Sequence, residues 1–375
     1  MQARPVKRKP SAAVEIVRRN LPVKRRPSGG EPLRITGQDI ADNTVPHFRD
    51  FVDQKLPDFR VAIPSHDRSE RLCTGTLAML RRHGINMKQV YVFVAPMATN
   101  AAGSPQWYEY LEAFRRHEFL DVHLEPGAFG LEGQLNCIMS WAQRGYLIVL
   151  TDDIYDIRER HVPMFHTSAR LDPLAAGLLK AVFAHAYALL VAGGFCAWSL
   201  NASSNVAYMT DDTISVKLGL LEGNVTGYLL ADDASDFHID KGMGVVSDLA
   251  MSLKLWNSGR RFVRYRSLCI QHRHRGPGGY DSVMTKEQRR GTEDEAIRAL
   301  ARKHPNLVSF HEKPNASLGQ QQYKFKNLGD VPLTMRPFLA DAGRPRVGFA
   351  GRAMTAAERK MRSRNGHRML IASED

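Results

Sequence analysis

Thr151-Asp152-Asp153-Ile154-Tyr155-Asp156 brings several carboxylates together directly after an apolar run that ends at Leu150. Two or three carboxylates at the end of a buried strand suit a hard divalent cation, Mg²⁺ or Mn²⁺, that also holds a diphosphate. The alternative is that one aspartate caps a following helix while the others are solvated. The position after an interior strand favours the metal-ligand interpretation.

Asp248 is a second candidate for chemistry, because it follows Ser247 near the start of an amphipathic stretch from Val245 to Asn257. A carboxylate in a site can take a proton from a reacting hydroxyl group as a general base. An aspartate at this place in a helix can also be an N-cap without any part in chemistry. The sequence leaves both roles open.

The segment from Gln271 to Tyr280 combines cations, glycines and an aromatic side chain, and we predict a loop there. Such a loop can follow a phosphate backbone and stack on an extruded base. The alternative is a Gly-Pro turn with incidental charge. The residues that we assign to nucleic-acid binding are Arg273, His274, Arg275, Gly278, Gly279 and Tyr280.

Several other kinds of site are not indicated. The sequence has no GxxxxGK pattern followed by Ser or Thr and no GxGxxG, which argues against a P-loop ATPase and a dinucleotide dehydrogenase. The four cysteines are far apart and form no CxxC motif, so we predict reduced core residues in a cytoplasmic protein.

Alternating strands and helices must position these residues. We predict helices around Leu72 to Leu80, Trp107 to Phe114 and Glu132 to Gln143, and strands at Phe59 to Ile63, Val90 to Ala95, Asp121 to Leu124 and Tyr146 to Leu150. This alternation predicts an α/β fold with a mostly parallel sheet covered by helices on both faces. Ligands of such sheets bind at the carboxyl ends of the strands, which here are followed by Pro64 to Arg68, residues 126–136 and Asp152-Asp153.

The second half of the sequence predicts further elements of the same kind. They are helices at Leu174 to Leu190 and Val245 to Asn257, and strands at Phe195 to Leu200, Thr213 to Leu221, Thr226 to Leu230 and Arg261 to Arg266. The apolar stretch from Ala181 to Leu200 is near the length of a membrane span. Because His185 and Gly193-Gly194 interrupt it, we interpret it as a buried helix, a turn and a buried strand, with a membrane helix as the alternative.

The charge of the chain favours a polyanionic partner. The net charge is +13, and ten basic residues stand against two acidic ones up to Arg34. A second basic cluster extends from Arg344 to Arg368. We predict a disordered basic arm at 1–45, a folded domain at 46–290 that begins near Phe48, and a helical or irregular extension with a basic tail at 291–375. A tail that only keeps the protein soluble is the alternative to phosphate contact.

Taken in order, these features resemble the GT-A glycosyltransferases. The shared pattern is a first strand ending in a Pro-Ser-x-x-Arg turn, an interior strand ending in Asp-Asp, a Ser-Asp that opens a later helix, and a His-rich loop. Ile63 to Arg68, Val90 to Val94, Leu131 to Asn136 and Gly278-Gly279 are similar to the TET-associated and base-J-type DNA glycosyltransferases of phages and kinetoplastids. The resemblance implies a Rossmann-type GT-A fold. It also implies transfer of a sugar to the hydroxymethyl group of a 5-hydroxymethylpyrimidine in DNA, and we expect this base to be 5-hydroxymethylcytosine.

The resemblance also implies a role for each matching residue. The donor would be a nucleotide sugar, a UDP-sugar, used with Mn²⁺ or Mg²⁺. Asp248 matches the general base of inverting members, and Asp153 with His272 or His274 matches the groups at the metal and diphosphate. Asp152 would contact the ribose or the sugar. The remaining residues implied at the uridine and diphosphate are Pro64, Ser65, Arg68, Gln134 and Asn136.

Two departures from the family pattern leave alternatives open. The usual acidic run reads Thr151-Asp152-Asp153, so Asp156 is a candidate for the missing carboxylate, and Leu135 stands where many relatives have a basic residue. The competing hypotheses are a glycosyltransferase for a protein or glycan acceptor and a non-catalytic DNA-binding α/β protein. We expect hydroxymethylated DNA as partner, no membrane partner, and a location in the cytoplasm, that of the host if a bacteriophage encodes the protein.

Overall fold

The computed structural model describes residues 33–42, 44–96, 98–99, 105–161, 169–210, 214–231, 234–272, 284–311 and 323–326. Most of both predicted basic tails lies outside these residues. The assigned nucleic-acid-binding residues Arg273 to Tyr280 lie outside them as well.

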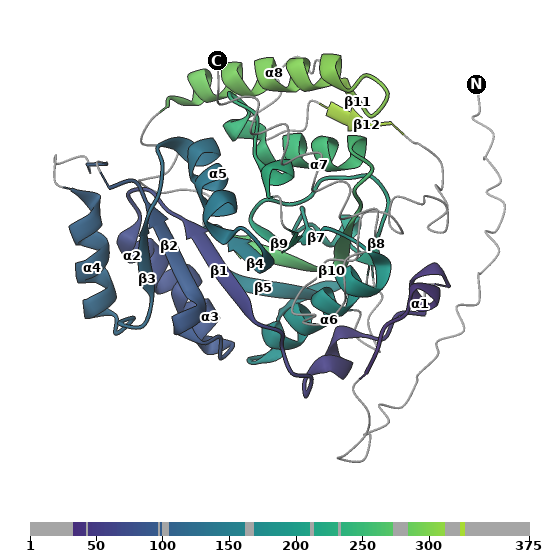
Figure 1. Cartoon of the computed structure of the whole chain (residues 1–375), viewed down its shortest axis with the longest axis horizontal. Helices are drawn as coiled ribbons and strands as arrows, with labels where there is room; N and C mark the ends of the chain where they lie inside the picture. Colours follow the sequence, from purple (N-terminus) through teal and green to yellow (C-terminus); the bar gives the residue numbers. More distant parts are fainter. Residues whose placement is uncertain are drawn as a thin grey trace, which may run out of the picture. The chain divides into compact units, whose positions relative to one another are not determined.

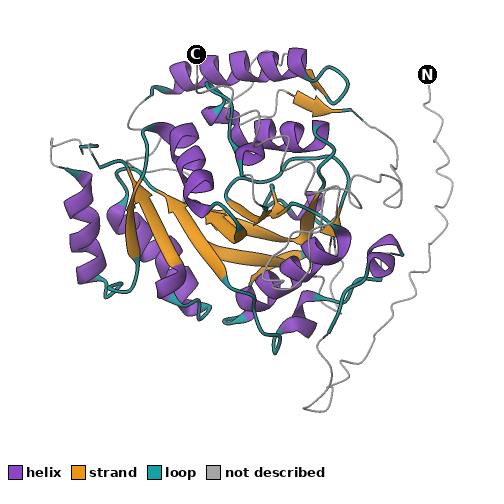
Figure 2. Ribbon diagram, viewed as in Figure 1, coloured by secondary structure: helices purple, strands orange, loops and turns teal. Residues whose placement is uncertain are grey.

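A ten-stranded sheet forms the centre of the described part (Figures 1 and 2). Its order is β3-β2-β1-β4-β9-β7-β10-β5-β6, with β8 paired to β10. Seven of the ten strands run in one direction, and β9, β5 and β8 run against them. The predicted α/β fold with a mostly parallel sheet is therefore confirmed. The strands are β1 (Phe59–Pro64), β2 (Val90–Val94), β3 (His123–Pro126), β4 (Gly145–Leu150), β5 (Ile154–His161), β6 (Arg170–Pro173), β7 (Ala197–Asn201), β8 (Ile214–Ser215), β9 (Val225–Leu230) and β10 (Phe262–His272).

Helices lie on both faces of the sheet because the central strands are apolar on both sides. In β1, Val61 and Ile63 join the core on one face, while Ala62 joins the core on the other. The first core is completed by α2 (Ser69–Leu72), α3 (Ala78–Arg82), α4 (Gln106–Arg116) and α6 (Leu178–Gly193), and the second by α5 (Gly130–Ala142) and α7 (Ser247–Asn257).

A third, smaller core joins the C-terminal elements to α7. Helix α8 (Lys286–Lys303) and the two-stranded sheet of β11 (Val308–Phe310) and β12 (Tyr323–Phe325) contribute apolar residues that pack with Leu249 and Leu253. The described part of the predicted C-terminal extension thus shares a core with the domain before it. The predicted division at 45 and 290 stays a prediction.

The apolar stretch from Ala181 to Leu200 is a buried helix, a turn and a buried strand, as predicted. Helix α6 ends at Gly193, and Gly194 has the left-handed backbone with φ of 62° that lets the chain turn into β7. Of the helices in the described ranges, none combines the length and the apolar character that crossing a bilayer requires.

Several predicted elements were wrong in extent. Of the strand predicted from Thr213 to Leu221, the described residues form only β8, and Gly219 then lies against the side chain of Arg264. Strand β3 begins two residues later than predicted. Strand β10 continues to His272, so Gln271 and His272 are not loop residues. A short helix, α1 (Gly37–Ala41), with a capping box from Thr36 and Asp39, precedes the predicted start at Phe48.

Candidate active site

The helical stretch after β1 forms hydrogen bonds to the turn that carries Asp152 and Asp153. Between α2 and α3 the chain forms a π-helical turn, Cys73–Leu77. Within it, the Thr76 hydroxyl donates to the carbonyl of Thr151 at 2.9 Å and accepts from the backbone N–H of Ile154 at 3.0 Å. Gly75 adds to this close approach, since a Cβ there would lie 3.2 Å from the Ile154 carbonyl oxygen. The π turn fixes both sides of the Asp-Asp pair.

Asp152 is buried and held by the turn after β1. Its Oδ2 accepts from Ser65 Oγ at 2.6 Å, and its Oδ1 accepts from Arg68 Nη1 at 3.0 Å. Tyr110 of α4 shares a hydrogen bond of 2.6 Å with Ser65 Oγ and accepts from the Arg68 backbone N–H. Burial raises the pKa of Asp152 although Arg68 and Ser65 oppose the shift. The structure therefore brings Ser65, Arg68 and Asp152 into one network.

Asp153 lies between two arginines of the same helical stretch. Its Oδ2 is 3.6 Å from Arg68 Nη1 and 3.7 Å from Arg71 Nη2. The three guanidinium nitrogens of Arg71 are buried and have no hydrogen-bond partner among the described residues. Arg71 was missed in the sequence, although it follows Arg68, the N-cap of α2, within the first turn of that helix.

Asp248 is connected to the Asp-Asp turn through the segment before β9. The carbonyl of Asn224 accepts from the Thr151 backbone N–H at 3.0 Å, and the Asn224 side-chain amide donates to the Glu222 carboxylate. The residue between them, Gly223, lies against Asp248, because a Cβ there would be 3.5 Å from Asp248 Cβ. The 222–224 segment thus connects the two carboxylate groups that the sequence singled out.

Asp248 is in the first turn of α7 but is not its N-cap, which is Val246. Its Oδ1 accepts from the Leu249 backbone N–H at 2.8 Å. Burial raises the pKa of Asp248, and burial together with the charge of Asp248 raises the pKa of Glu222 to about 8. Glu222 was missed in the sequence, where it is a single charge in an apolar run.

His272 is brought next to the Asp-Asp turn by the pairing of β10 with β5. In this antiparallel pair His272 lies opposite Ile154, the residue after Asp153, at a point where the register shifts. His272 and Asp153 thus come from two segments that meet at the same edge of the sheet. The metal roles of both residues remain predictions.

The residues predicted beside the base and ribose differ in their surroundings. Pro64 is the last residue of β1. Gln134 is buried on α5, its Nε2 donates to the Ser65 carbonyl at 3.5 Å, and its Oε1 has no partner among the described residues. Both polar atoms of the Asn136 side chain bind the backbone of Ile239, at 2.6 and 2.9 Å. Ligand roles for Asn136 and Gln134 stay predictions, and Gln134 Oε1 lies against Gly127, where an added Cβ would be 2.1 Å from it.

Asp156 does not fill the place of a missing carboxylate at the turn. It lies inside β5, and its Oδ1 accepts from Arg82 of α3 at 2.6 Å, with Arg158 Nε at 3.7 Å from its other oxygen. The alternative in which an aspartate caps a following helix is also wrong, because the element that follows Asp153 is strand β5.

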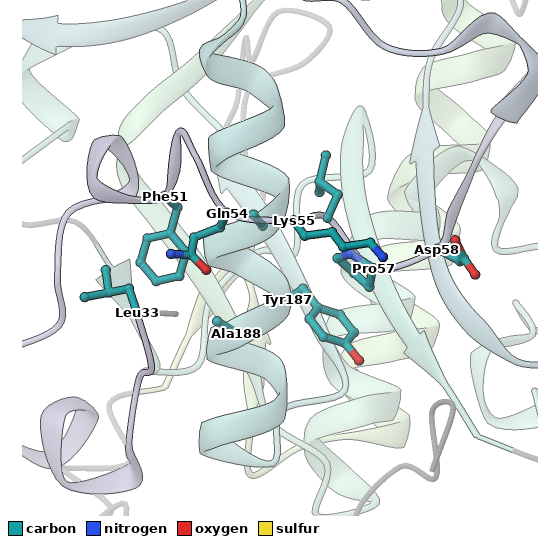
Figure 3. Close-up of a pocket in the computed structure, with 10 residues that line it drawn as sticks. Leu33, Phe51, Gln54, Lys55, Pro57, Asp58, Tyr187 and Ala188 are labelled. Carbon is teal, nitrogen blue, oxygen red and sulfur yellow. The ribbon is translucent and has the colours of Figure 1, made fainter. Parts of the chain in front are cut away.

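Two cavities lie at opposite ends of the strands of the sheet. One of about 520 Å³ lies at the carboxyl ends of β2 and β3, on the edge of the candidate site, and is lined by Pro96, Pro105, Trp107, Tyr108, Leu124 and Pro126. The other, of about 350 Å³, is shown in Figure 3 and is lined in part by Pro57, Asp58 and Tyr187. Because Pro57 and Asp58 precede β1, this second cavity lies at its amino end, away from the candidate site.

Comparison with known proteins gives only distant structural similarity. No family model and no curated protein sequence matches the chain. A CMP-2-keto-3-deoxy-manno-octonic acid synthetase in complex with CTP aligns with a TM-score of 0.34 and 11% identity, over 66% of this chain and 99% of the other.

Two further solved structures align at a similar level. A mannosyltransferase from Pyrobaculum calidifontis with GDP-Man and Mn²⁺ aligns with a TM-score of 0.36 and 12% identity, over 71% and 73%. A UTP-bound UGPase from Acinetobacter baumannii aligns with a TM-score of 0.31 and 8% identity, over 57% and 87%. Similarity at this level is no evidence for a shared activity, so the functional argument depends on the site.

Proposed function

We propose that this chain is a glycosyltransferase that moves a sugar from a nucleotide sugar to a hydroxyl group. The observation that carries the proposal is the buried guanidinium of Arg71, which lies beside Arg68 and Asp153 with its nitrogens unsatisfied among the described residues. Buried donors without partners are rare and need an explanation. The oxygens of a diphosphate would provide the missing acceptors.

A cavity at the same edge of the sheet suits the base of a nucleotide. The cavity at the ends of β2 and β3 offers Trp107, Tyr108 and three prolines as flat apolar surface for a base. Ligands of α/β sheets bind at this edge.

Asp248 has the chemistry of a base for the acceptor. In the proposed step the acceptor oxygen forms a bond to the anomeric carbon while the bond from that carbon to the diphosphate oxygen breaks. The hydroxyl proton passes to Asp248, and the nucleoside diphosphate leaves with the bonding electrons. Arg68 and Arg71 would stabilise the negative charge that accumulates on the leaving phosphate.

The described residues of the site would supply some of the ligands of a divalent cation. The described residues contain no group of three or more metal-binding side chains. Asp153 and His272 would supply one carboxylate and one imidazole, and Mg²⁺ commonly binds through one or two carboxylates plus substrate phosphates. When bound, such an ion would add positive charge at the leaving diphosphate.

For the acceptor, we propose the hydroxymethyl group of a 5-hydroxymethylpyrimidine in DNA. The net charge of +13, concentrated in the first 34 residues, supports a polyanionic acceptor over a neutral glycan. A protein acceptor remains the competing hypothesis, and the assay below distinguishes the two.

The test is to incubate the protein with Mn²⁺, a panel of nucleotide sugars and hydroxymethylated duplex DNA, with unmodified duplex as control. After digestion to nucleosides, we expect a mass increment of a hexose or an N-acetylhexosamine only on the modified base. Hydrolysis of a nucleotide sugar without transfer to DNA would support the proposed donor site and exclude DNA as the acceptor. Absence of both binding and turnover of every donor would contradict the proposed function.

A matched pair of variants tests the donor site by itself. Arg71→Met should weaken binding of the active nucleotide sugar by at least about tenfold, because it removes a charged donor to phosphate. It should lower the Tm only slightly, because the guanidinium makes no hydrogen bond to the described residues and Arg68 stays beside Asp153 when the ion pair with Arg71 is lost. Arg81→Met, on the exposed side of α3, is the control and should bind the donor normally.

A further inference from the structure

We propose that Gln106 and Tyr110 of α4 are positioning residues that hold Arg68 in place for the phosphates of the donor. They act on the turn at residues 65–68, which follows β1 and ends at Arg68. Neither residue was singled out in the sequence. The inference rests on the proposed function, in which Arg68 is one of the two cations at the diphosphate.

The 65–68 turn needs support because Asp67 has a left-handed backbone, with φ of 55°. This conformation is uncommon for residues other than glycine and persists where the surroundings hold it. Gln106 provides such a contact, since its Oε1 accepts from the Asp67 backbone N–H at 2.9 Å. Its Nε2 donates to the Thr99 carbonyl at 3.0 Å, and the side chain is fully buried. The amide of Gln106 is thus fixed at both ends.

Tyr110 provides a second contact through a chain of hydrogen bonds. Its hydroxyl oxygen accepts from the Arg68 backbone N–H at 3.2 Å and lies 2.6 Å from Ser65 Oγ. Because Ser65 has one hydroxyl hydrogen and donates it to the Asp152 carboxylate, Tyr110 is the donor to Ser65. The other oxygen of Asp152 accepts from Arg68 Nη1 at 3.0 Å. The chain therefore begins at the backbone of Arg68 and returns to its side chain.

The same helix also lines the cavity assigned to the base. Trp107 and Tyr108, which directly follow Gln106, contribute to the cavity at the ends of β2 and β3. No residue of the 65–68 turn lines that cavity. Loss of a contact between α4 and the turn should therefore weaken binding of the phosphates and leave binding of the base unchanged. A role in folding alone would not distinguish the two parts of the ligand.

The first test needs no ligand and uses the full chain. Tyr110→Phe keeps the ring against Phe114 and removes only the hydroxyl group. Hydrogen exchange at the Arg68 amide should become at least about tenfold faster, because this N–H loses its acceptor. Gln106→Met should have the same effect at the Asp67 amide. An unchanged exchange rate at either amide would overturn the role assigned to the residue that was replaced.

The second test compares a nucleoside diphosphate with its nucleoside, for whichever of UDP, CDP, GDP and ADP the wild type binds most tightly. In NMR titrations, Tyr110→Phe should weaken binding of the diphosphate by about tenfold and leave binding of the nucleoside unchanged.

Tyr146→Phe is the matched control. Tyr146 is also buried, and its hydroxyl group accepts from Trp198 Nε1 at 2.8 Å and donates to the Phe183 carbonyl at 3.1 Å. Because these partners lie outside the candidate site, Tyr146→Phe should lower the Tm but keep both affinities. It should also leave the exchange rate of the Arg68 amide unchanged relative to the rest of the core.

The outcomes separate this inference from the proposed function. A wild type that binds none of the four diphosphates would reject the proposed donor site, and this inference with it. A wild type that binds one of them keeps the donor site. The inference is then overturned if Tyr110→Phe binds the diphosphate as tightly as Tyr146→Phe does, or if the diphosphate and the nucleoside lose affinity by the same factor.

Discussion

Asp248 shows how one residue can satisfy two interpretations of a sequence. It lies in the first turn of α7, where an aspartate stabilises a helix, yet it is not the N-cap. Its carboxylate accepts one backbone N–H, and the segment with Glu222 and Gly223 lies against it. Asp248 therefore has a neighbour outside its own helix, in the segment that also contacts the Asp152-Asp153 turn.

Replacing Asp248 by Asn separates the two interpretations. Asn keeps the shape and an oxygen for the Leu249 backbone N–H, but it cannot take the acceptor proton. Transfer should fall by about 10² to 10⁴, while the donor Kd stays nearly unchanged and the Tm does not fall. The rate of sugar transfer and isothermal titration with the donor measure the two effects. A transfer rate near that of the wild type would reject Asp248 as the base.

At the scale of elements, the candidate site depends on the π-helical turn Cys73–Leu77 between α2 and α3. This turn presents Thr76 to the backbone on both sides of Asp152 and Asp153. The same helical stretch carries Arg68 and Arg71, so one element positions both the cations and the carboxylates. Distortion of this element should change donor binding and stability together.

Thr76→Val tests the role of this element. Val has the size of Thr but leaves the Thr151 carbonyl and the Ile154 N–H without their hydrogen-bond partner, which should cost about 1–3 kcal/mol of unfolding free energy. Donor binding should weaken in parallel, because Asp153 and Arg71 would no longer be held in a fixed geometry. Thr74→Val is the control, since Thr74 is exposed and donates only to the Glu70 carbonyl in its own helix. Urea unfolding and donor titration should separate the two variants, and equal stabilities would contradict the assigned role of the turn.

At the scale of the whole molecule, the charge is distributed very unevenly along the chain. The first 34 residues hold ten of the basic residues and only two acidic ones, against a net charge of +13 for 375 residues. A partner with a regular array of negative charge would bind such a segment without reading a sequence. The proposed catalytic residues lie elsewhere in the chain, so binding of the acceptor and turnover of the donor should be separable.

Deleting residues 1–32 tests this separation and spares Leu33, which packs against the core. Affinity for duplex DNA should fall, and the slope of log K against log salt should become flatter by about 0.9 for each phosphate that the shortened chain no longer neutralises. Hydrolysis of the free nucleotide sugar should continue at the wild-type rate. A chain in which Gln replaces the Lys and Arg of this segment controls for its length and should behave like the deletion. An unchanged salt slope would exclude phosphate contact by the segment.

The sequence by itself determined the elements and one edge of the site. Strands β1, β2 and β4 and helices α4 and α5 were predicted to within two residues, because the apolar periodicity that defines them is local. The Asp152-Asp153 pair was predicted at the end of an interior strand for the same reason, and the structure places it there in contact with Ser65 and Arg68.

Only the tertiary structure decided what else meets at that edge. Strand β9 is antiparallel to β4, so the first residues of β9 lie at the edge where β4 ends. Glu222 lies at this edge because it precedes its strand, whereas Asp152 and Asp153 follow theirs. His272 comes next to Asp153 through the pairing of β10 with β5, two segments more than a hundred residues apart. Asp156, four residues after Asp152, is bound instead by Arg82. Strand direction, register and ion-pair partners depend on long-range pairing, which no local pattern of residues encodes.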